Sequence, residues 1–268
     1  MIETLVVQVT NRCPYYCPQC YMRKGNMEMP SGIVFQYIDE LSYHGLEAVQ
    51  ITGGEPLVYS QLCELIEYAH KKGLYVFLAT SGYNHSIALY QALLNSGLDV
   101  LCVSINDIDE SINQLTRDAY GESIMAILDA LEVGLTCFAN VVVSDQNIKN
   151  LELLAQYLKR LGVERVDVLR PVNSFDGKYV PSVFQQTIQQ LDDIVKNDPE
   201  FFRVENCFKE YWEYITQKAF VCQDVGNTTL FVNVDGTVSP CSKLQYNRYA
   251  SVNEMMNAEN QWKGGCYI

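Results

Sequence analysis

Three cysteines within eight residues are the first side chains in this sequence whose type and spacing can do chemistry. Cys13, Cys17 and Cys20 lie in the segment Cys-Pro-Tyr-Tyr-Cys-Pro-Gln-Cys, directly after the apolar run Leu5–Val9. The two prolines disfavour a helix, so we expect a loop that leaves a strand and brings its thiols together. Three thiolates that converge on one point are typical of a metal site.

The number of thiols favours an iron–sulfur cluster over zinc. A structural zinc site has four protein ligands and no open coordination position, and the ligands usually come as two Cys-x2-Cys pairs. Here one loop supplies three ligands, and no histidine or second pair follows closely. Because a cuboidal cluster has four irons, three cysteines leave one iron open to a substrate or cofactor. A redox dithiol and a zinc knuckle are the alternatives.

A second motif, Thr52-Gly53-Gly54-Glu55-Pro56, follows the strand-like run Ala48–Ile51. Paired glycines let the backbone approach a ligand closely, and the proline fixes the chain as it leaves. Glu55 can accept a charge-assisted hydrogen bond from an ammonium group, so an amino-acid-like ligand fits. By itself, such a turn is more often an ordinary connection from a strand to a helix.

Together the two motifs resemble the radical S-adenosylmethionine (SAM) superfamily, whose signature is Cys-x3-Cys-x2-Cys and whose SAM-binding turn is Gly-Gly-Glu-Pro. The resemblance implies that the three cysteines hold a 4Fe-4S cluster. It also implies that the open iron chelates SAM and that Gly53, Gly54 and Glu55 contact it. One electron from the reduced cluster would then cleave SAM, and the resulting 5′-deoxyadenosyl radical would abstract hydrogen from a substrate.

Six strand-like runs alternate with helical patterns as far as Arg170-Pro171, which predicts an α/β fold with a parallel sheet and right-handed crossovers. The expected helices span 31–44, 60–72, 86–96, 109–133 with a break at Gly121, and 147–161. The resemblance implies a partial (β/α)6 TIM-like barrel. In such barrels the chemistry lies at the carboxyl ends of the strands. We expect a core of residues 1–205 that ends with a connector helix at 183–197.

Polar residues at two further strand ends are candidate cofactor ligands. If Thr80 and Ser104 face the barrel interior, Cys102 and Asn106 share the face of Ser104. The resemblance matches Thr80 to the family's Thr-Asn-Gly turn, and it places the serine and asparagine in the fourth-strand motif near SAM. It puts Arg117 near the SAM carboxylate. Cys102 is a weak candidate for a hydrogen-donating thiol, with core packing as the alternative.

One position departs from the family pattern. Relatives usually carry an aromatic residue just before the third cysteine, beside the adenine, but this chain has Gln19. Tyr15, Tyr16 and Tyr21 lie nearby, so a different side chain is expected to pack on the adenine.

The chain changes character at Asn206, after which aromatic residues cluster and Cys222, Cys241 and Cys266 appear at wide spacing. Strand-like runs flank Asp235-Gly236, a strong hairpin signal. With the hairpin, the cysteine spacing resembles the SPASM/twitch extension of radical SAM enzymes, which holds auxiliary iron–sulfur clusters. Residues 206–268 are therefore expected to form an auxiliary-cluster domain, with a short helix at 250–257. Cys207 is a possible fourth ligand, and zinc or three unrelated thiols are the alternatives.

The composition indicates in which compartment the protein works and which kinds of partner it is expected to bind. The formal net charge is −13, which argues against nucleic acid as a partner. No run of eighteen apolar residues and no basic leader is present, so we expect a cytoplasmic protein that does not bind membranes. Ten cysteines then indicate metal ligation in a reducing compartment.

The resemblance implies an oxidoreductase, since a substrate radical that gives up its electron needs an acceptor such as an auxiliary cluster. Relatives with this extension mostly modify ribosomally made precursor peptides. We therefore expect a peptide crosslink or dehydrogenation, with epimerisation possible, and a reductant such as flavodoxin or ferredoxin as partner. A small-molecule radical SAM dehydrogenase is the first alternative. A non-catalytic iron–sulfur or zinc binding protein is the second.

Overall fold

A curved sheet of nine strands forms the centre of the computed structural model, which describes residues 1–222 and 224–258. The strand order is β7-β6-β5-β4-β3-β2-β1-β8-β9, and every neighbouring pair is parallel except β8 and β9. The bounds of the strands are β1 Thr4–Gln8, β2 Ala48–Thr52, β3 Tyr75–Thr80, β4 Val100–Ser104, β5 Thr136–Val142, β6 Arg165–Leu169, β7 Phe202–Val204, β8 Thr229–Val232 and β9 Val238–Ser239. Because β7 and β9 are its edges, the sheet is an open barrel, as predicted.

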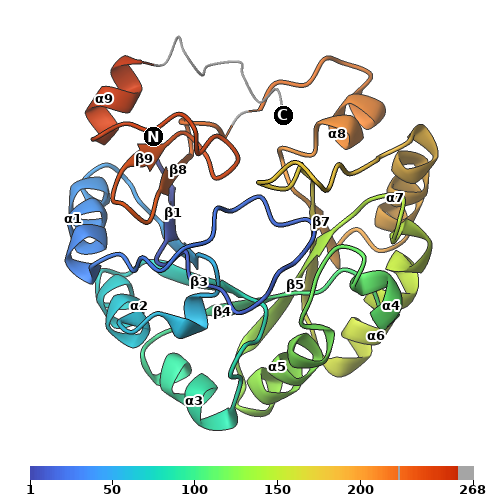
Figure 1. Cartoon of the computed structure of the whole chain (residues 1–268), viewed down its shortest axis with the longest axis horizontal. Helices are drawn as coiled ribbons and strands as arrows, with labels where there is room; N and C mark the ends of the chain where they lie inside the picture. The colour runs from blue at the N-terminus through green and yellow to red at the C-terminus, as the bar shows by residue number, and fades with distance from the viewer. Residues whose placement is uncertain (223, 259–268) are drawn as a thin grey trace.

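Helices line the outer side of this sheet and follow it around in chain order (Figure 1). Their bounds are α1 Ser31–Ser42, η1 Pro56–Val58, α2 Leu62–Lys71, α3 Ile87–Asn95, α4 Glu110–Asn113, α5 Tyr120–Glu132, η2 Ile148–Asn150, α6 Leu151–Leu161, α7 Gln185–Asn197, α8 Lys209–Thr216 and α9 Val252–Asn257. None of the helices in the described ranges combines the length and apolar character that crossing a lipid bilayer requires.

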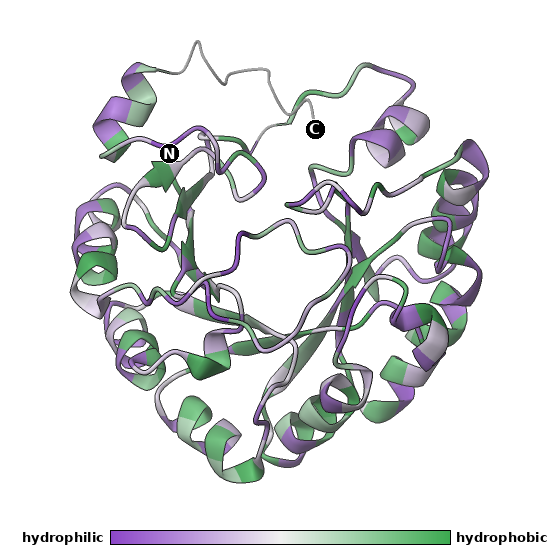
Figure 2. Cartoon of the chain, viewed as in Figure 1, coloured by the Kyte–Doolittle hydropathy of each residue, from purple (hydrophilic) through white to green (hydrophobic). Residues whose placement is uncertain are grey.

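The main core lies between the sheet and the helices. Helix α2 shows how the sequence specifies it, because its buried residues Leu62, Leu65, Ile66 and Ala69 recur at helical spacing along one face. These residues join a cluster that includes side chains from β1 to β6. In Figure 2 the strands carry much of the hydrophobic colour, and the helices alternate between the two colours. The buried apolar face therefore fixes each helix against the sheet and leaves the carboxyl ends of the strands open to loops.

The helix predicted over 109–133 is broken, as expected, but the break does not lie at Gly121. The chain forms two helices, α4 and α5, and the break lies at residues 114–119, whereas Gly121 lies inside α5. The Asn113 side chain explains the break. Its Oδ1 accepts hydrogen bonds from the backbone of Asn106 and Asp107, and its Nδ2 donates to the Arg117 carbonyl at 2.9 Å. These bonds turn the chain back toward the end of β4 instead of continuing the helix.

The last part of the chain adds strands to the barrel sheet. The hairpin predicted around Gly236 is present as β8 and β9, and β8 pairs with β1 in parallel register. The connector helix is confirmed as α7 and the short helix as α9. β7 and α8 were not predicted, since each is short. The domain boundary after residue 205 stays a prediction.

Candidate functional site

The cysteine loop leaves β1 and returns to α1 across the carboxyl edge of the sheet. An antiparallel bridge between Thr10 and Glu28 closes the base of the loop. The thiols of Cys13, Cys17 and Cys20 are partly exposed and are not in disulfides. The loop tightens at its end, where Cys20 N donates to the Cys17 carbonyl at 3.1 Å.

The chemistry of this donor set fits an iron–sulfur cluster better than a single ion. No group of three His, Cys, Asp or Glu side chains in the described ranges is arranged around one metal ion. In a cuboidal cluster each thiolate binds a different iron, so its ligands need not converge on one point. Burial raises the pKa of Cys13 to about 11, and the Lys24 charge opposes this rise. A cationic cluster next to these sulfurs would favour their thiolate form in the same way.

Lys24 is a further feature of the loop that fits an anionic group. Its Nζ is buried and has no hydrogen-bond partner among the described residues, and it lies 4.0 Å from the centre of the Tyr16 ring. The Nε of Arg117 is also buried and has no hydrogen-bond partner among the described residues. Two buried cationic groups with unsatisfied N–H bonds beside a thiol loop suit thiolates or a carboxylate ligand.

The glycine turn after β2 lies directly against the cysteine loop. Gly54 N donates to the Thr10 carbonyl at 2.7 Å, and Glu55 N donates to the Arg12 carbonyl at 2.8 Å. A Cβ at Gly53 would lie 2.7 Å from the Thr10 carbonyl oxygen, and one at Gly54 would lie 2.2 Å from that of Arg12. We expected the glycines to admit a ligand. In the structure, the backbone that they admit is that of the cysteine loop.

Gly54→Ala is therefore predicted to displace the loop from the turn. A methyl group that overlaps backbone cannot be relieved by a side-chain rotation, so we expect a loss of about 1–3 kcal/mol in the free energy of unfolding. Chemical denaturation of the cluster-free protein measures it. Gly121→Ala is the matched control, because a Cβ there meets nothing within 4 Å, and an alanine inside α5 should be neutral or stabilising. Equal stability of the two variants would contradict the packing role of Gly54.

Glu55 is fully buried at the end of this turn. Its Oε1 accepts from Thr80 Oγ1 at 2.6 Å and from Leu57 N at 3.0 Å, and its Oε2 accepts from Ser81 N at 2.8 Å. Burial raises the pKa of Glu55, and the bond from Thr80 is the largest of the effects that oppose the rise. The carboxylate thus ties the ends of β2 and β3 together. Its predicted contact with an ammonium group stays a prediction.

Thr80 does not face the barrel interior, which corrects our expectation. It lies on the same face of β3 as Val76 and Leu78, and these two pack in the main core against the helices. Phe77 and Ala79, on the other face, pack instead on the inner cluster formed by Val100, Cys102 and Phe138. Thr80 therefore reaches Glu55 and the backbone N of Gly82, at 2.9 Å.

Arg117 is brought to the same rim. Its Nη1 donates to Ser81 Oγ at 3.0 Å, although the two residues are far apart in the sequence. Burial raises the pKa of Glu55 and of Cys20, and the Arg117 charge opposes both rises, so it lies close enough to both for an electrostatic effect. The predicted neighbourhood of Arg117 and the cysteine loop is present, and its contact with SAM stays a prediction.

The end of β4 holds Ser104 partly exposed and Asn106 buried. The Asn106 carboxamide is engaged by protein: its Nδ2 donates to Gln19 Oε1 at 3.1 Å and to Thr116 Oγ1 at 2.7 Å, and its Oδ1 accepts from Val142 N at 3.0 Å. Gln19, at the position that is aromatic in relatives, is thus buried in a polar network. Cofactor contacts by Ser104 and Asn106 stay predictions.

Cys102 lies one layer below Ser104 on the inner face of the sheet. It is buried against Val100 and Phe138, and burial raises the pKa of its thiol. Core packing was the alternative role for Cys102, and the structure shows this packing. Its role as a hydrogen donor stays a prediction.

The C-terminal segment packs on the cysteine loop from the other side. Gln245 Nε2 donates to Met22 Sδ at 2.8 Å. Gly226 N donates to the Pro240 carbonyl at 3.0 Å, which brings the chain after Cys222 beside the chain before Cys241. Both cysteines are partly exposed, and Cys266 lies outside the described residues. The sequence therefore placed two of its three auxiliary candidates on neighbouring segments.

Cys207 is involved in a buried ion pair that the sequence did not reveal. Lys243 Nζ lies 2.6 Å from Cys207 Sγ and 2.6 Å from Glu205 Oε2, and the lysine side chain is only 9% exposed. Burial opposes the charge on Lys243, but the carboxylate and the sulfur raise its pKa. Burial raises the pKa of the Cys207 thiol, and the Lys243 charge opposes this rise.

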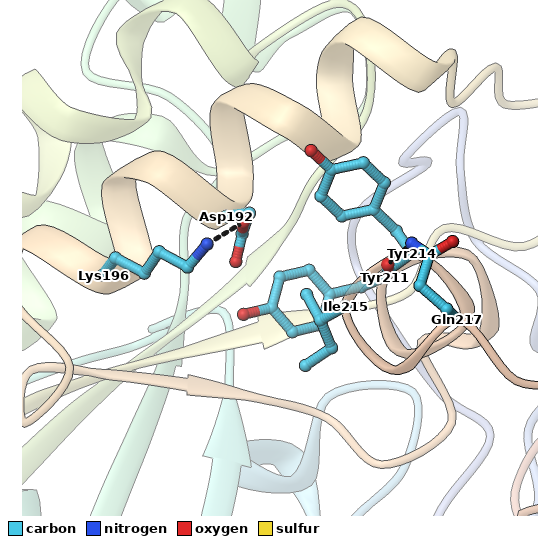
Figure 3. Close-up of a pocket in the computed structure, with 6 residues that line it drawn as sticks. All are labelled: Asp192, Lys196, Tyr211, Tyr214, Ile215 and Gln217. Carbon is cyan, nitrogen blue, oxygen red and sulfur yellow. Dashed lines mark hydrogen bonds and ion pairs between the residues drawn. The ribbon is translucent and has the colours of Figure 1, made fainter.

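A cavity of about 430 Å³ lies away from these residues, between α7 and α8 (Figure 3). It is lined by Asp192, Lys196, Tyr211, Tyr214, Ile215 and Gln217, and the first two form an ion pair within α7. None of the predicted site residues lines it. Its lining includes no cysteine, and its two charged side chains pair with each other. We therefore do not assign this cavity to the site at the cysteine loop.

Comparison with known proteins gives the family. The profile of the radical SAM superfamily matches residues 7–158, a range that contains the cysteine loop, the glycine turn and the rim residues up to Arg117. PqqA peptide cyclase of Granulibacter bethesdensis is 28% identical over 172 residues, which cover 61% of this chain and 46% of the relative. PqqA peptide cyclase of Methylobacterium sp. (strain 4-46) is 29% identical over a stretch of the same length, with 61% and 45% covered. The chain therefore spans less than half the length of these relatives.

Solved structures agree on the fold. The crystal structure of Streptococcus suis SuiB superposes with a TM-score of 0.78 at 17% identity, covering 99% of this chain and 66% of SuiB. Native anSMEcpe with bound AdoMet superposes with a TM-score of 0.69 at 17% identity, covering 98% of this chain and 80% of that protein. The superfamily uses a 4Fe-4S cluster and SAM. The profile match spans more than half of the chain, so this protein belongs to the radical SAM superfamily.

Proposed function

We propose that this protein is a radical SAM enzyme that modifies a peptide, with a 4Fe-4S cluster on Cys13, Cys17 and Cys20. The observation that carries the proposal is the contact between the cysteine loop and the glycine turn, through Gly54 N and Glu55 N, with Arg117 at the same rim. The three thiols, the buried Glu55 carboxylate and the Arg117 guanidinium, whose Nε has no partner among the described residues, thus belong to connected loops at the carboxyl edge of the sheet. When bound, the cluster supplies the electron that cleaves SAM.

The chain's own residues would bind and orient SAM. Arg117 has a buried Nε without a partner among the described residues, so it can take the carboxylate of an amino-acid-like ligand. Glu55 and Thr80 hold the ends of β2 and β3 in place beside it. Ser104, partly exposed at the end of β4, would contact SAM through its hydroxyl. Rigid strand ends fix these groups, which limits wasteful reaction of a radical with solvent.

A peptide substrate is supported by the relatives. The curated relatives are named PqqA peptide cyclases, and SuiB was solved bound to precursor peptide SuiA. That complex superposes with a TM-score of 0.76. We propose a ribosomally made precursor peptide as substrate, a crosslink or dehydrogenation as outcome, and flavodoxin or ferredoxin as electron donor in the cytoplasm.

The test is a mass measurement on a precursor peptide, to be sought as a short reading frame beside the gene. Incubated with reconstituted enzyme, SAM and reductant, it should lose two mass units per modification while 5′-deoxyadenosine accumulates. An unchanged mass in ordinary water with one deuterium gained per site in deuterated water would indicate epimerisation instead, and Cys102 would then be tested as donor. Turnover of sugars or nucleosides with no change in the peptide would support the small-molecule dehydrogenase. A protein that binds a cluster but never cleaves SAM would be a binding protein.

We also propose an auxiliary iron–sulfur cluster in a SPASM/twitch-like segment, held by Cys222, Cys241 and Cys266, with Cys207 as fourth ligand. The proximity of the segments at Gly226 and Pro240 supports it. Alanine at the first three positions should lower the iron content by about half, since both clusters have four irons. Cys63→Ala, on the exposed face of α2, is the control. Equal iron in both proteins, or zinc in the wild type, would contradict the auxiliary cluster, and adding Cys207→Ala tests the fourth ligand.

A further inference from the structure

We propose that Asp118 is a positioning residue for the cluster, because it holds the cysteine loop in its ligand-binding shape. The inference rests on the proposed cluster at Cys13, Cys17 and Cys20. Asp118 lies in the connection between α4 and α5, next to the candidate cofactor ligand Arg117, and belongs to no motif of its own.

Two positions of this connection, Thr116 and Asp118, bind the cysteine loop. Asp118 Oδ2 accepts from Tyr16 N at 2.6 Å, and Asp118 N donates to Cys17 Sγ at 3.4 Å. Thr116 O accepts from Gln19 N at 3.1 Å. Between these contacts, Arg117 points to Ser81 on the next loop. The connection therefore fixes the loop on both sides of its second cysteine.

The connection has a rigid support. Asn113 and Thr116 are buried, and Asn113 joins the backbone of Asn106 at the end of β4 to the carbonyl of Arg117. Asn106 in turn donates to both Thr116 and Gln19. This polar network connects the cysteine loop to the strand ends, so the position of Asp118 is set by the barrel.

The backbone at Ala119 directs the chain at this point. Its φ of 67° lies in the left-handed region, which is unfavourable for a residue other than glycine. Such conformations persist only where the surrounding structure imposes them, and they gather at functional sites. Ala119 is the N-cap residue of α5, so this turn lies between Asp118 and the first residue of the helix.

The two bonds of Asp118 have different chemical consequences. The N–H on Cys17 Sγ stabilises negative charge on a ligand sulfur, which is how hydrogen bonds tune iron–sulfur clusters. The carboxylate on Tyr16 N fixes the backbone between the first two cysteines, so it orders the loop before the cluster binds. Removing the second bond should weaken the site without touching a ligand.

The experiment compares Asp118→Ala with Asp118→Asn, since the asparagine oxygen can still accept the Tyr16 N–H. Each protein is reconstituted anaerobically, and iron loss to EDTA is followed by absorbance. We expect Asp118→Ala to lose its cluster at least about tenfold faster than the wild type, the usual effect of a lost outer-shell bond. Asp118→Asn should lose iron at nearly the wild-type rate. The reduced Asp118→Ala cluster should also show a broadened electron paramagnetic resonance signal.

Asp193→Ala is the matched control, because it removes one exposed carboxylate from α7. The proposal is overturned if Asp118→Ala loses iron no faster than this control, or if the asparagine variant behaves like the alanine variant. It is also overturned if the cluster-free Asp118→Ala protein melts more than about 4 °C below the wild type, since one surface hydrogen bond accounts for less. A wild type that takes up no cluster overturns the cluster assignment as well. A stable wild-type cluster with an unaffected Asp118→Ala variant overturns only the role of Asp118.

Discussion

Alanine in place of Cys13, Cys17 and Cys20 together should abolish SAM cleavage. No other loop among the described residues brings three thiols to the carboxyl edge of the sheet, so the variant has nothing to hold the cluster that reduces SAM. We expect 5′-deoxyadenosine formation to fall by roughly 10⁶-fold or more, to the uncatalysed level. The measurement is chromatography of the nucleoside after anaerobic incubation with SAM and dithionite.

Two comparisons make this prediction specific. Cys63→Ala removes an exposed thiol of α2 and should leave the rate unchanged. The triple variant should also keep the melting temperature of the cluster-free wild type, because the three side chains are only partly buried. If the triple variant still forms 5′-deoxyadenosine, the cysteine loop is not the site of the cluster.

Glu55→Ala should unfold more easily and lose SAM binding. The substitution leaves the Thr80 hydroxyl and the backbone N–H groups of Leu57 and Ser81 buried without their acceptor. Each such group costs about 1–3 kcal/mol, so we expect the free energy of unfolding to fall by about 3 kcal/mol or more. For a chain of this size the melting temperature would fall by about 6–12 °C. Calorimetry of the cluster-free protein measures this without SAM.

Glu55→Gln separates the charge from the hydrogen bonds. It keeps one oxygen for Thr80 and Leu57 but places an amide N–H against the N–H of Ser81. The loss should therefore be about 1–2 kcal/mol, smaller than that of the alanine variant. Unchanged stability in both variants would show that the carboxylate does not connect β2 to β3.

The parts of the fold that follow a single local rule were predictable. The first six strands and most helices alternate with clear periodicity, and the hairpin carries an Asp-Gly turn. The pairing of β8 with β1 was not predictable, because it joins segments over two hundred residues apart and depends on the curvature of the whole sheet. β7 has three residues, too few for a periodic pattern.

The candidate site also has parts that the sequence predicted and parts that it did not. The sequence predicted that the cysteines and the glycine turn lie at one rim, and in the structure the turn contacts the cysteine loop. The facing of Thr80 was wrong because Thr80 shares the face of Val76 and Leu78, and these two pack outward in the main core, where Thr80 bonds Glu55. Asp118 and Lys243 escaped notice since neither belongs to a motif. Only the folded chain brings Asp118 to Cys17 and Lys243 to Cys207.

The most direct test of the central claim is electron paramagnetic resonance of the reduced, reconstituted protein with and without SAM. A four-iron cluster on Cys13, Cys17 and Cys20 has one iron without a protein ligand, so SAM should bind it and shift the g values. The experiment is best done with Cys222, Cys241 and Cys266 replaced by alanine, so that one cluster gives the whole signal. We predict a four-iron signal that SAM shifts. A signal that SAM leaves unchanged, or its persistence after Cys13, Cys17 and Cys20 are also replaced, would contradict the assignment.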